Sequence, residues 1–224
     1  MNNKKYFISF EGIDGSGKDT QLNELIKQIK ENDNYPFKDK YSNIWITREP
    51  TNMTKSGNEI SKKIRESNVS AKEATKLYIE DRKQHTITIK QILEHSHVLT
   101  SRYDISTLTY QMTQGIPFET LYKLHNFEKG ECIIPDITLI FEIPAEIAFE
   151  RIKKRGQIQE CFERIEFLKK LVNIQKEVIK KLQNRGRNII IINANQEIEK
   201  VTKEMFEKIA NNINNKTKNV QTTI

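Results

Sequence analysis

The segment Gly12 to Lys18, GIDGSGK, has residue types and spacing that suit the binding of phosphate. Its glycines let the backbone curl so that several N–H groups point at one anion, and Lys18 adds a positive charge. An apolar run at residues 6–10, typical of a buried strand, precedes the segment, and a pattern typical of an amphipathic helix follows it. This strand–loop–helix context is the one that a nucleotide-binding P-loop requires, because the helix N-terminus contributes its dipole.

One position in this loop departs from the usual pattern. The residue after the lysine of a P-loop is normally Ser or Thr, whose hydroxyl contacts Mg²⁺. Here that residue is Asp19, and Thr20 follows it. Mg²⁺ also accepts carboxylate oxygens, so Asp19 is the candidate metal ligand.

Composition and charge indicate a chain of one domain that binds small anions. The 224 residues carry a net charge of +7, and the cluster Lys153 to Arg155 favours a nucleotide over a nucleic acid. No apolar run approaches the roughly 20 residues that span a bilayer, and a signal-peptide core is lacking. The two cysteines lie outside any pattern typical of zinc sites. We expect a cytoplasmic protein without membrane or nucleic-acid partners, with one domain at 1–215 and a disordered tail at 216–224.

Alternating apolar and amphipathic stretches predict an α/β fold. Short apolar runs predict strands at residues 6–10, 43–47, 97–100, 136–143 and 188–192. Helical patterns are found at residues 71–93, 106–114, 118–128, 144–155, 164–183 and 197–213. Because the strands are apolar on both faces and alternate with helices, they should form a five-stranded parallel sheet with helices on both faces.

Charged and polar side chains follow the expected strands, at the edge where α/β proteins bind ligands. Arg48 comes directly after the second strand, although an ion pair with Glu49 explains it equally well. Tyr78 and Arg82 lie one turn apart in the helix at 71–93, where they could contact a flat ligand or simply belong to the core and the solvated face. A polar group on one face of the helix at 106–114 suggests a site rather than a core: Thr107, Tyr110 and Gln111.

The order and spacing of several segments resemble the thymidylate kinase family; the segments are FEGIDGSGK, TREP, Asp81-Arg82, SRYDISTLTYQ, PDITL and NANQEIEKV. The resemblance covers nearly the whole chain, from Tyr6 to Ile209. It implies a P-loop nucleoside monophosphate kinase-like fold with a short lid at 153–164, and a homodimer. The activity that it implies is transfer of the γ-phosphoryl group of Mg-ATP to dTMP, which gives dTDP for dTTP synthesis.

The resemblance also implies a role for each matching residue. It places ATP on Gly12, Ile13, Asp14, Gly15, Ser16, Gly17, Lys18, Asp19, Thr20 and Gln196. It places dTMP on Asp14, Arg48, Tyr78, Arg82, Arg102, Thr107, Tyr110 and Gln111. Tyr78 would stack on the thymine ring, Arg82 would bond a thymine carbonyl, and Arg102 would grip the acceptor phosphate. Lys18, Arg102 and the lid residue Arg155 would be the catalytic cations.

Further roles follow from the same resemblance. Asp14 would reach the 3′-hydroxyl of the sugar, Thr107 would bond the base edge, and Tyr110 would crowd the 2′ position against ribonucleotides. Lys153, Lys154 and Arg155 would be the first residues of the lid segment.

Two departures from the family pattern concern the metal site. Asp19 replaces the usual Ser or Thr, and Ser101 replaces the aspartate of the family's Asp-Arg-Tyr segment. Both positions flank the Mg²⁺ of P-loop proteins, so the carboxylate has moved across the site rather than disappeared. The alternative is that Asp19 faces solvent and water completes the metal shell. The lid is also short, with Cys161 near the place of a family arginine.

No general base is expected. A monophosphate has a second pKa of about 6, so its attacking oxygen is ionised at pH 7, and the protein mainly positions and neutralises two polyanions. The histidines have no metal-like spacing and are interpreted as structural: His85, His95, His97 and His125. Two alternatives stay open, namely a kinase of the same fold for another deoxynucleotide or a deoxynucleoside, and a catalytically inactive nucleotide-binding homologue.

Overall fold

A computed structural model of the chain describes residues 4–31, 43–156 and 161–221, apart from the side chains of 161–164 and 216–221. Its strands are β1 (Phe7–Glu11), β2 (Asn43–Arg48), β3 (Ser96–Ser101), β4 (Ile137–Glu142) and β5 (Ile189–Asn193). They form one parallel sheet in the order β2-β3-β1-β4-β5. The five-stranded parallel sheet predicted from the sequence is confirmed.

β1 lies at the centre of the sheet, between β3 and β4. Near its carboxyl end, Phe10 is in register with Ser101 of β3 and with Leu139 of β4. The chain moves from one half of the sheet to the other beside β1, and open α/β sheets bind their ligands at such a point. The loop after β1 therefore starts where a ligand site is expected.

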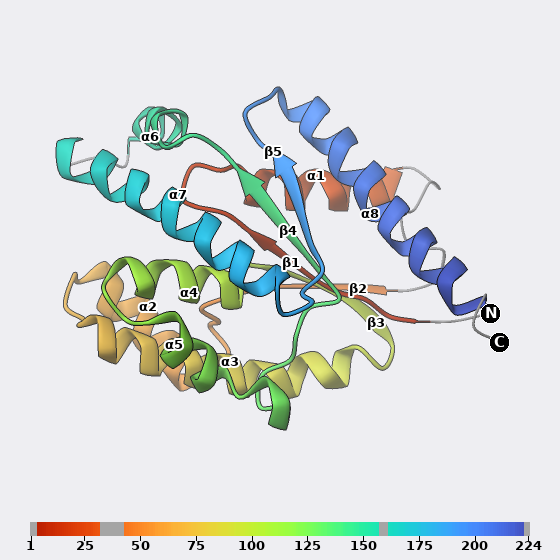
Figure 1. Cartoon of the computed structure of the whole chain (residues 1–224), viewed down its shortest axis with the longest axis horizontal. Coiled ribbons are helices and arrows are strands. Elements are labelled where there is room, and N and C mark those ends of the chain that lie inside the picture. The colour runs from red at the N-terminus through yellow and green to blue at the C-terminus, as the bar shows by residue number, and fades with distance from the viewer. Residues whose placement is uncertain (1–3, 32–42, 157–160, 222–224) are drawn as a thin grey trace.

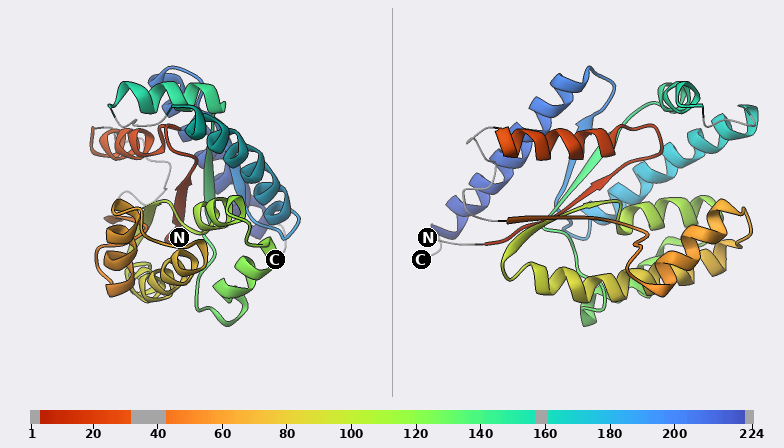
Figure 2. Two further views of the ribbon diagram at one scale, coloured as in Figure 1. Left: turned by 90° about the vertical axis from the view of Figure 1, so that its left-hand side faces the viewer. Right: turned by 180° about the vertical axis from the view of Figure 1, so that it is seen from behind.

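Helices cover both faces of the sheet, as the sequence predicts. They are α1 (Lys18–Glu31), α2 (Lys55–Arg65), α3 (Ala71–Ile92), α4 (Asp104–Thr113), α5 (Phe118–His125), α6 (Ala145–Lys154), α7 (Cys161–Gln183) and α8 (Ile198–Gln221), with a 3₁₀ turn at Phe127–Lys129. In Figures 1 and 2, α1 and α8 lie on one face, and α3, α4 and α5 lie on the other. α7 packs against α4 and α6, so it connects the two sides of the site.

Three helices differ from the sequence prediction. α2 forms in a stretch for which the sequence predicts no element, and the Thr54 hydroxyl caps it by accepting the Gly57 N–H at 2.9 Å. The helix predicted at 118–128 ends at His125, because Asn126 adopts a left-handed conformation with φ 50°. α8 continues to Gln221, whereas disorder is predicted from residue 216, because extending an anchored helix adds a hydrogen bond for each residue. Residues 157–160 of the predicted lid lie outside the described residues.

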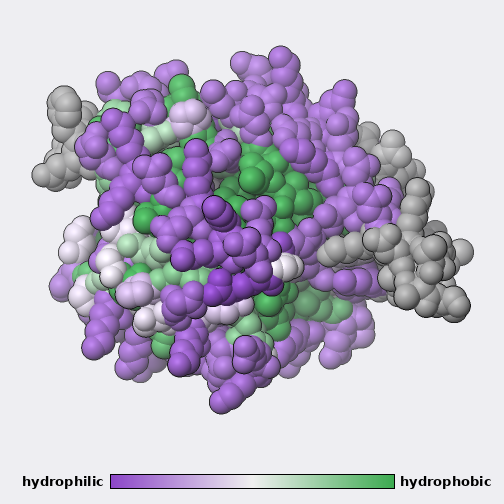
Figure 3. Space-filling model, viewed as in Figure 1, coloured by the Kyte–Doolittle hydropathy of each residue, from purple (hydrophilic) through white to green (hydrophobic). Residues whose placement is uncertain are grey.

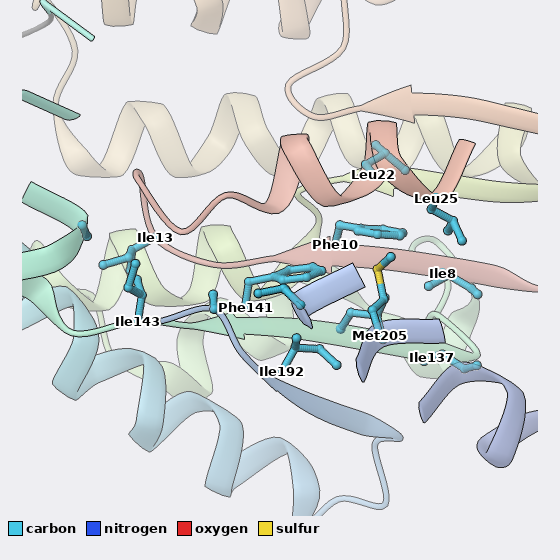
Figure 4. Close-up of a cluster of buried hydrophobic side chains, with 14 of the residues drawn as sticks. Ile8, Phe10, Ile13, Leu22, Leu25, Ile137, Phe141, Ile143, Ile192 and Met205 are labelled. Atoms are coloured by element: carbon cyan, nitrogen blue, oxygen red, sulfur yellow. The ribbon is translucent and has the colours of Figure 1, made fainter. Parts of the chain in front are cut away.

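The largest core lies between the sheet and helices α1 and α8 (Figure 4). Phe10 of β1 stacks on Phe141 of β4 with ring centroids 5.8 Å apart, and Met205 of α8 belongs to the same cluster. Phe7 points to the opposite face, where its ring meets Tyr103 edge-on at 5.0 Å. A strand that buries side chains on both faces is a firm base for the loop that follows it.

The face of the molecule shown in Figure 3 is mostly hydrophilic. A hydrophobic area lies near the middle of the face in Figure 3. β5 runs at the edge of the sheet, and its residue Ile191 is 38% exposed. Among the residues that the structure describes, no helix is both long and apolar enough to cross a membrane.

Candidate active site

The loop between β1 and α1 is built as the P-loop pattern predicts. Gly15 and Gly17 have φ values of 81° and 83°, which side chains rarely adopt, and a Cβ on Gly15 would lie 2.5 Å from the Ala148 carbonyl oxygen. α1 begins at Lys18, a residue that is 4% exposed. Burial and the nearby Arg102 lower the pKa of the Lys18 ammonium, although neighbouring carboxylates oppose this shift. Lys18 is thus a poorly hydrated cation beside a helix N-terminus, which suits a phosphate.

Two cavities adjoin this loop. One of about 170 Å³ is lined by Asp14, Gly15, Gly17, Lys18, Asp19, Thr20, Ile152 and Arg155. The other, of about 250 Å³, is lined by Ser16, Gly17, Thr20, Gln21, Arg151, Arg155, Ala194, Gln196, Glu197, Ile198 and Val201. These linings include the predicted donor residues except Gly12 and Ile13, and the Ile13 side chain belongs to the main core. Gln196 is held by its amide, which donates to the Asn193 carbonyl and to Glu204, each at 2.9 Å.

A larger cavity of about 410 Å³ lies on the other side of Asp14. It is lined by Asp14, Arg48, Glu49, Pro50, Ile64, Val69, Ala74, Tyr78, Arg82, Arg102, Tyr103, Ser106, Thr107, Tyr110, Gln111, Gln114 and Phe167. Every residue predicted to bind the acceptor is in this lining. The structure therefore brings together side chains from β2, α3, the β3–α4 connection and α4, which are far apart in the sequence.

Arg82 is neither solvated nor free to move, since it is 1% exposed. Its Nε and Nη2 donate to Oε2 of Glu49 at 2.8 and 2.5 Å, and Nη2 also donates to the Thr107 hydroxyl at 3.0 Å. Its Nη1 lies 2.7 Å from Nε2 of His125. Burial by itself lowers the pKa of Arg82, but Glu49 more than offsets this effect, so the guanidinium stays charged. Of its five N–H groups, these contacts leave one on Nη1 for a ligand.

His125 fixes the free end of this arginine, a role that the sequence did not reveal. Its Nδ1 lies 2.7 Å from the Leu121 carbonyl oxygen and must donate to it, so Nε2 is the acceptor for Arg82. Burial and the adjacent guanidinium lower the pKa of His125 to about 3, which keeps the ring neutral. His125 is therefore structural, as predicted, but it acts on a site residue.

The remaining acceptor residues range from exposed to buried. Tyr78 is half-buried on α3, and burial raises the pKa of its phenol. Arg48 is exposed at the end of β2. Gln111 is 2% exposed, and its Oε1 lies 3.1 Å from the Thr75 hydroxyl. No ion pair between Arg48 and Glu49 is found among the described residues, because Glu49 is instead bound by Arg82.

Arg102 lies between the donor and acceptor cavities. Its Nη2 donates to Asp14, and its guanidinium carbon lies 5.6 Å from the centre of the Tyr110 ring. The Tyr110 hydroxyl also donates to Asp14, at 3.0 Å. Arg102 has a φ of 66°, in the left-handed region that is uncommon outside glycine. Asp14 is thus held from two sides by residues predicted to contact the acceptor.

Asp19 and Ser101, the two departures from the family pattern, touch each other. The Ser101 hydroxyl donates to Oδ1 of Asp19, while Oδ2 lies 3.6 Å from the Lys18 ammonium. Burial raises the pKa of Asp19, but Lys18 and the Ser101 hydrogen bond outweigh that effect and lower it. The Asp19 side chain is 68% exposed and ionised at neutral pH, so its oxygens are accessible at the edge of the 170 Å³ cavity.

Two more residues belong to the site but have no clear signal in the sequence. Arg151, one turn before the end of α6, donates from Nη2 to the Ala194 carbonyl at 3.0 Å and lines the 250 Å³ cavity. Phe167 of α7 lines the acceptor cavity, and its ring centre lies 6.4 Å from that of Tyr110. Both lie on helices whose pattern explains them equally well as surface residues, so only the fold identifies them.

Comparison with known proteins gives one consistent result. A sequence profile of the family described as thymidylate kinase matches residues 10–205. A protein of Methanococcus maripaludis with the name "Probable thymidylate kinase" is 31% identical over 215 residues, which cover 92% of this chain and 96% of that protein. Proteins with the same name from Methanococcus vannielii and Methanosarcina mazei are 38% identical over 165 residues (74% of this chain, 73% of the relative) and 33% identical over 207 residues (90% and 94%). The chain belongs to the thymidylate kinase family.

Proposed function

We propose that this chain transfers the γ-phosphoryl group of ATP to dTMP and forms dTDP. The observation that carries the proposal is the 410 Å³ cavity, whose lining contains every residue predicted to bind the acceptor and which shares Asp14 with the cavity at the P-loop. Two phosphorylated ligands that meet at this shared boundary would have their phosphates close together. Family membership and the names of the relatives support the same activity.

Thymine is the base that fits the polar groups of the acceptor cavity best. Arg82 keeps one N–H for a ligand, and the Thr107 hydroxyl, which accepts from Arg82, still has its hydrogen to donate. The exposed edge of thymine offers a carbonyl oxygen at the place where cytosine has an amino group. The amino group of cytosine is itself a donor, so it would face the donors of Arg82 and Thr107. A buried polar group would then lack a hydrogen-bond partner, which is costly. Tyr78 lines the same cavity and would stack on the ring.

Phosphoryl transfer needs positioned cations rather than a general base. The dTMP phosphate has a second pKa of about 6, so its attacking oxygen carries no proton at pH 7. Arg102 would hold this phosphate, releasing Asp14 for the sugar 3′-hydroxyl, and Lys18 would hold the donor phosphates. Arg155 is exposed and lines both donor cavities, so it would neutralise the transferred group.

Asp19 and Ser101 would supply the protein ligands of the Mg²⁺ that accompanies ATP. The donor set fits, because an ionised, exposed carboxylate lies against a hydroxyl at the P-loop, and Mg²⁺ prefers oxygen ligands. The described residues contain no cluster of three or more His, Cys, Asp or Glu, which suits a metal that is held largely by the phosphates. When bound, the ion neutralises charge on the phosphate oxygens. Ser101 holds Asp19 in place for it.

Three wider expectations stay proposals. The family resemblance supports a homodimer, and Ile87 on α3, 61% exposed, offers an apolar contact; light scattering of the purified chain tests it. We propose a cytoplasmic location, which cell fractionation tests. We also propose that nucleic acid is not a partner, since the functional cations line nucleotide-sized cavities; a filter-binding assay with DNA and RNA at physiological salt tests this.

The direct experiment measures ADP release with Mg-ATP and each candidate acceptor. Turnover with dTMP, and not with thymidine, supports the proposed function. Turnover mainly with another deoxynucleotide or with a deoxynucleoside identifies a different kinase of the same fold. Thermal stabilisation by ATP and dTMP without turnover identifies an inactive nucleotide-binding homologue.

A further inference from the structure

Glu11, the last residue of the central strand β1, is fully buried and has no role in the proposed chemistry. Burying a carboxylate is costly unless its oxygens are hydrogen-bonded. Here Oε1 accepts the backbone N–H groups of Tyr103 and Ile105 at 2.9 and 3.1 Å, and Oε2 accepts the Ser106 hydroxyl at 2.5 Å. The donors are the last residue before α4 and two residues in the first turn of that helix. Glu11 therefore ties the end of β1 to one short segment of the chain.

Arg102 directly precedes this segment, and its backbone is strained. The left-handed region is unfavourable for a non-glycine residue, so the Arg102 φ of 66° persists only where the surroundings enforce it. The Arg102 N–H donates to the Phe10 carbonyl at 2.9 Å, which fixes the residue on its N-terminal side. On the C-terminal side, Glu11 binds the next residues. β1 thus holds Arg102 from both sides through its last two residues.

Glu11 also caps the N-terminus of helix α4. α4 starts at Asp104, and its N-cap residue Tyr103 has no side-chain hydrogen bond that caps the helix. The Glu11 carboxylate accepts the Ile105 N–H in the first turn instead, where a negative charge is favoured. The direction in which α4 leaves the sheet is therefore set from β1.

A second contact reaches the Arg102 side chain. The Ser106 hydroxyl that donates to Glu11 lies 3.3 Å from Nη1 of Arg102 and accepts its N–H. Among the described residues of this segment, only Ser106 has a side chain that hydrogen-bonds to both the Glu11 carboxylate and the Arg102 guanidinium. Glu11 therefore acts on the backbone of Arg102 and, through Ser106, on its guanidinium.

We propose that Glu11 is a positioning residue, which holds Arg102 in the left-handed conformation and aims its guanidinium at the phosphate of the acceptor. The inference rests on the proposed function, since that function assigns the acceptor phosphate to Arg102. It predicts that loss of Glu11 weakens binding of the phosphate of dTMP, not of its nucleoside.

Calorimetric titration of the full chain with dTMP and with thymidine tests this, at pH 8 so that Glu11 is ionised. Glu11→Ala is expected to weaken dTMP binding at least about tenfold, because a hydrogen bond to a charged group is lost, and to change thymidine binding by less than about twofold. An equal loss for both ligands, or no loss for dTMP, overturns the inference. A parent chain that binds neither ligand contradicts the proposed function itself, and the two failures are thereby distinguished.

The matched control is Asp136→Ala, at the opposite end of β1. Asp136 accepts the Phe7 N–H at 2.9 Å, so the variant also removes a carboxylate bound to the backbone of this strand. It should lower the melting temperature without weakening dTMP binding. If it weakens dTMP binding as much as Glu11→Ala does, the effect is general destabilisation and the inference fails.

Two further variants separate positioning from stability. Glu11→Gln keeps an acceptor for both N–H groups and can donate to Ser106, so it should restore most of the affinity for dTMP. In an Arg102→Ala background, Glu11→Ala should add little, and a full additive loss contradicts action through Arg102. If Glu11→Ala does not fold, Ser106→Ala takes its place in the test. This variant should weaken the binding of dTMP and not that of thymidine. Equal weakening of the binding of both ligands overturns the inference.

Discussion

The acceptor and donor sides of the site are built in opposite ways. On the acceptor side, Arg82 is 1% exposed, and Glu49, Thr107 and His125 hold it in place. On the donor side, Arg155 is exposed, and within the described residues no hydrogen bond or ion pair reaches its guanidinium. A fixed cation can discriminate between acceptors, because a wrong group finds no adaptable partner. An unattached cation can move to the charge that develops during transfer.

The largest expected effect comes from the donor side. If Arg155 meets the transferred phosphoryl group, Arg155→Ala should lower kcat by at least about 10³-fold with little change in KM, as for other transition-state arginines. Steady-state ADP release measures both constants. Arg185→Ala, which removes an exposed arginine bound to Glu119, is the control. A change in KM alone makes Arg155 a ground-state binder, and Lys153, Lys154 or Arg164 then becomes the candidate.

For the stability of the fold, Arg82 on the acceptor side should matter more than Arg155 on the donor side. Arg82→Met removes the guanidinium paired with the buried Glu49, which keeps its contact with His85 at 2.9 Å, and should lower the free energy of unfolding by about 3–5 kcal/mol. Arg155→Met, on an exposed side chain, should change it by less than about 0.5 kcal/mol. Urea unfolding of the two variants measures both values. Equal losses would mean that the two arginines are held equally firmly, contrary to the contrast drawn between the two sides.

The metal site between the two sides gives a smaller effect. Asp19→Ser should reduce activity at limiting Mg²⁺ by at least about tenfold, while Ser101→Asp alone should change it little. The double variant should recover much of the loss, because it restores the usual placement of hydroxyl and carboxylate. Titration of activity with Mg²⁺, and of Mn²⁺ binding by electron paramagnetic resonance, measures the cycle. Strict additivity, or a fully active Asp19→Ser chain at limiting Mg²⁺, contradicts the proposal that the metal-binding carboxylate has moved from position 101 to position 19.

The smallest effect concerns the pH dependence of stability. Burial, and then Asp104, raise the pKa of Glu11 from 4.5 to about 7, although Ser106, Arg102 and Arg82 lower it. The folded state therefore binds the proton more tightly than the unfolded chain, and stability falls as pH rises from about 4.5 to about 7. Glu11→Gln removes this contribution. Between pH 5 and pH 7 the free energy of unfolding of the variant should therefore fall by roughly 1–2 kcal/mol less than that of the parent chain. Urea unfolding at both pH values checks this, and identical slopes would contradict a raised pKa.

The sequence predicts the site where a local pattern specifies it. The P-loop is contiguous, so its own pattern identifies it, whereas the roles expected of Tyr78, Arg82 and Thr107 come from the family resemblance. What holds them could not be predicted in the same way. Glu49 and His125 lie 33 and 43 residues from Arg82 along the chain, and only the packing of α3 against its neighbours brings them into contact.

The fold shows the same division between local and distant causes. Apolar runs predict all of the strands. Burial on both faces explains the signal of β1, β3 and β4, whereas the edge strands β2 and β5 are apolar but only partly buried. The end of α5 depends on a single left-handed residue, Asn126, which the helical pattern around it hides. Glu11 belongs to the segment FEGIDGSGK, but the role proposed for it depends on contacts with Tyr103 to Ser106. Those residues are more than 90 positions away along the chain, so the sequence around the loop does not predict the contacts.

Acceptor specificity tests the central claim most directly, because it depends on the fixed geometry around Arg82. The measurement is kcat/KM of the full chain for dTMP and for dCMP, by ADP release at saturating Mg-ATP. A site that offers donors to a thymine carbonyl should prefer dTMP strongly, by up to about 10⁴-fold. Comparable values for dTMP and dCMP would contradict both the acceptor and the recognition described for it.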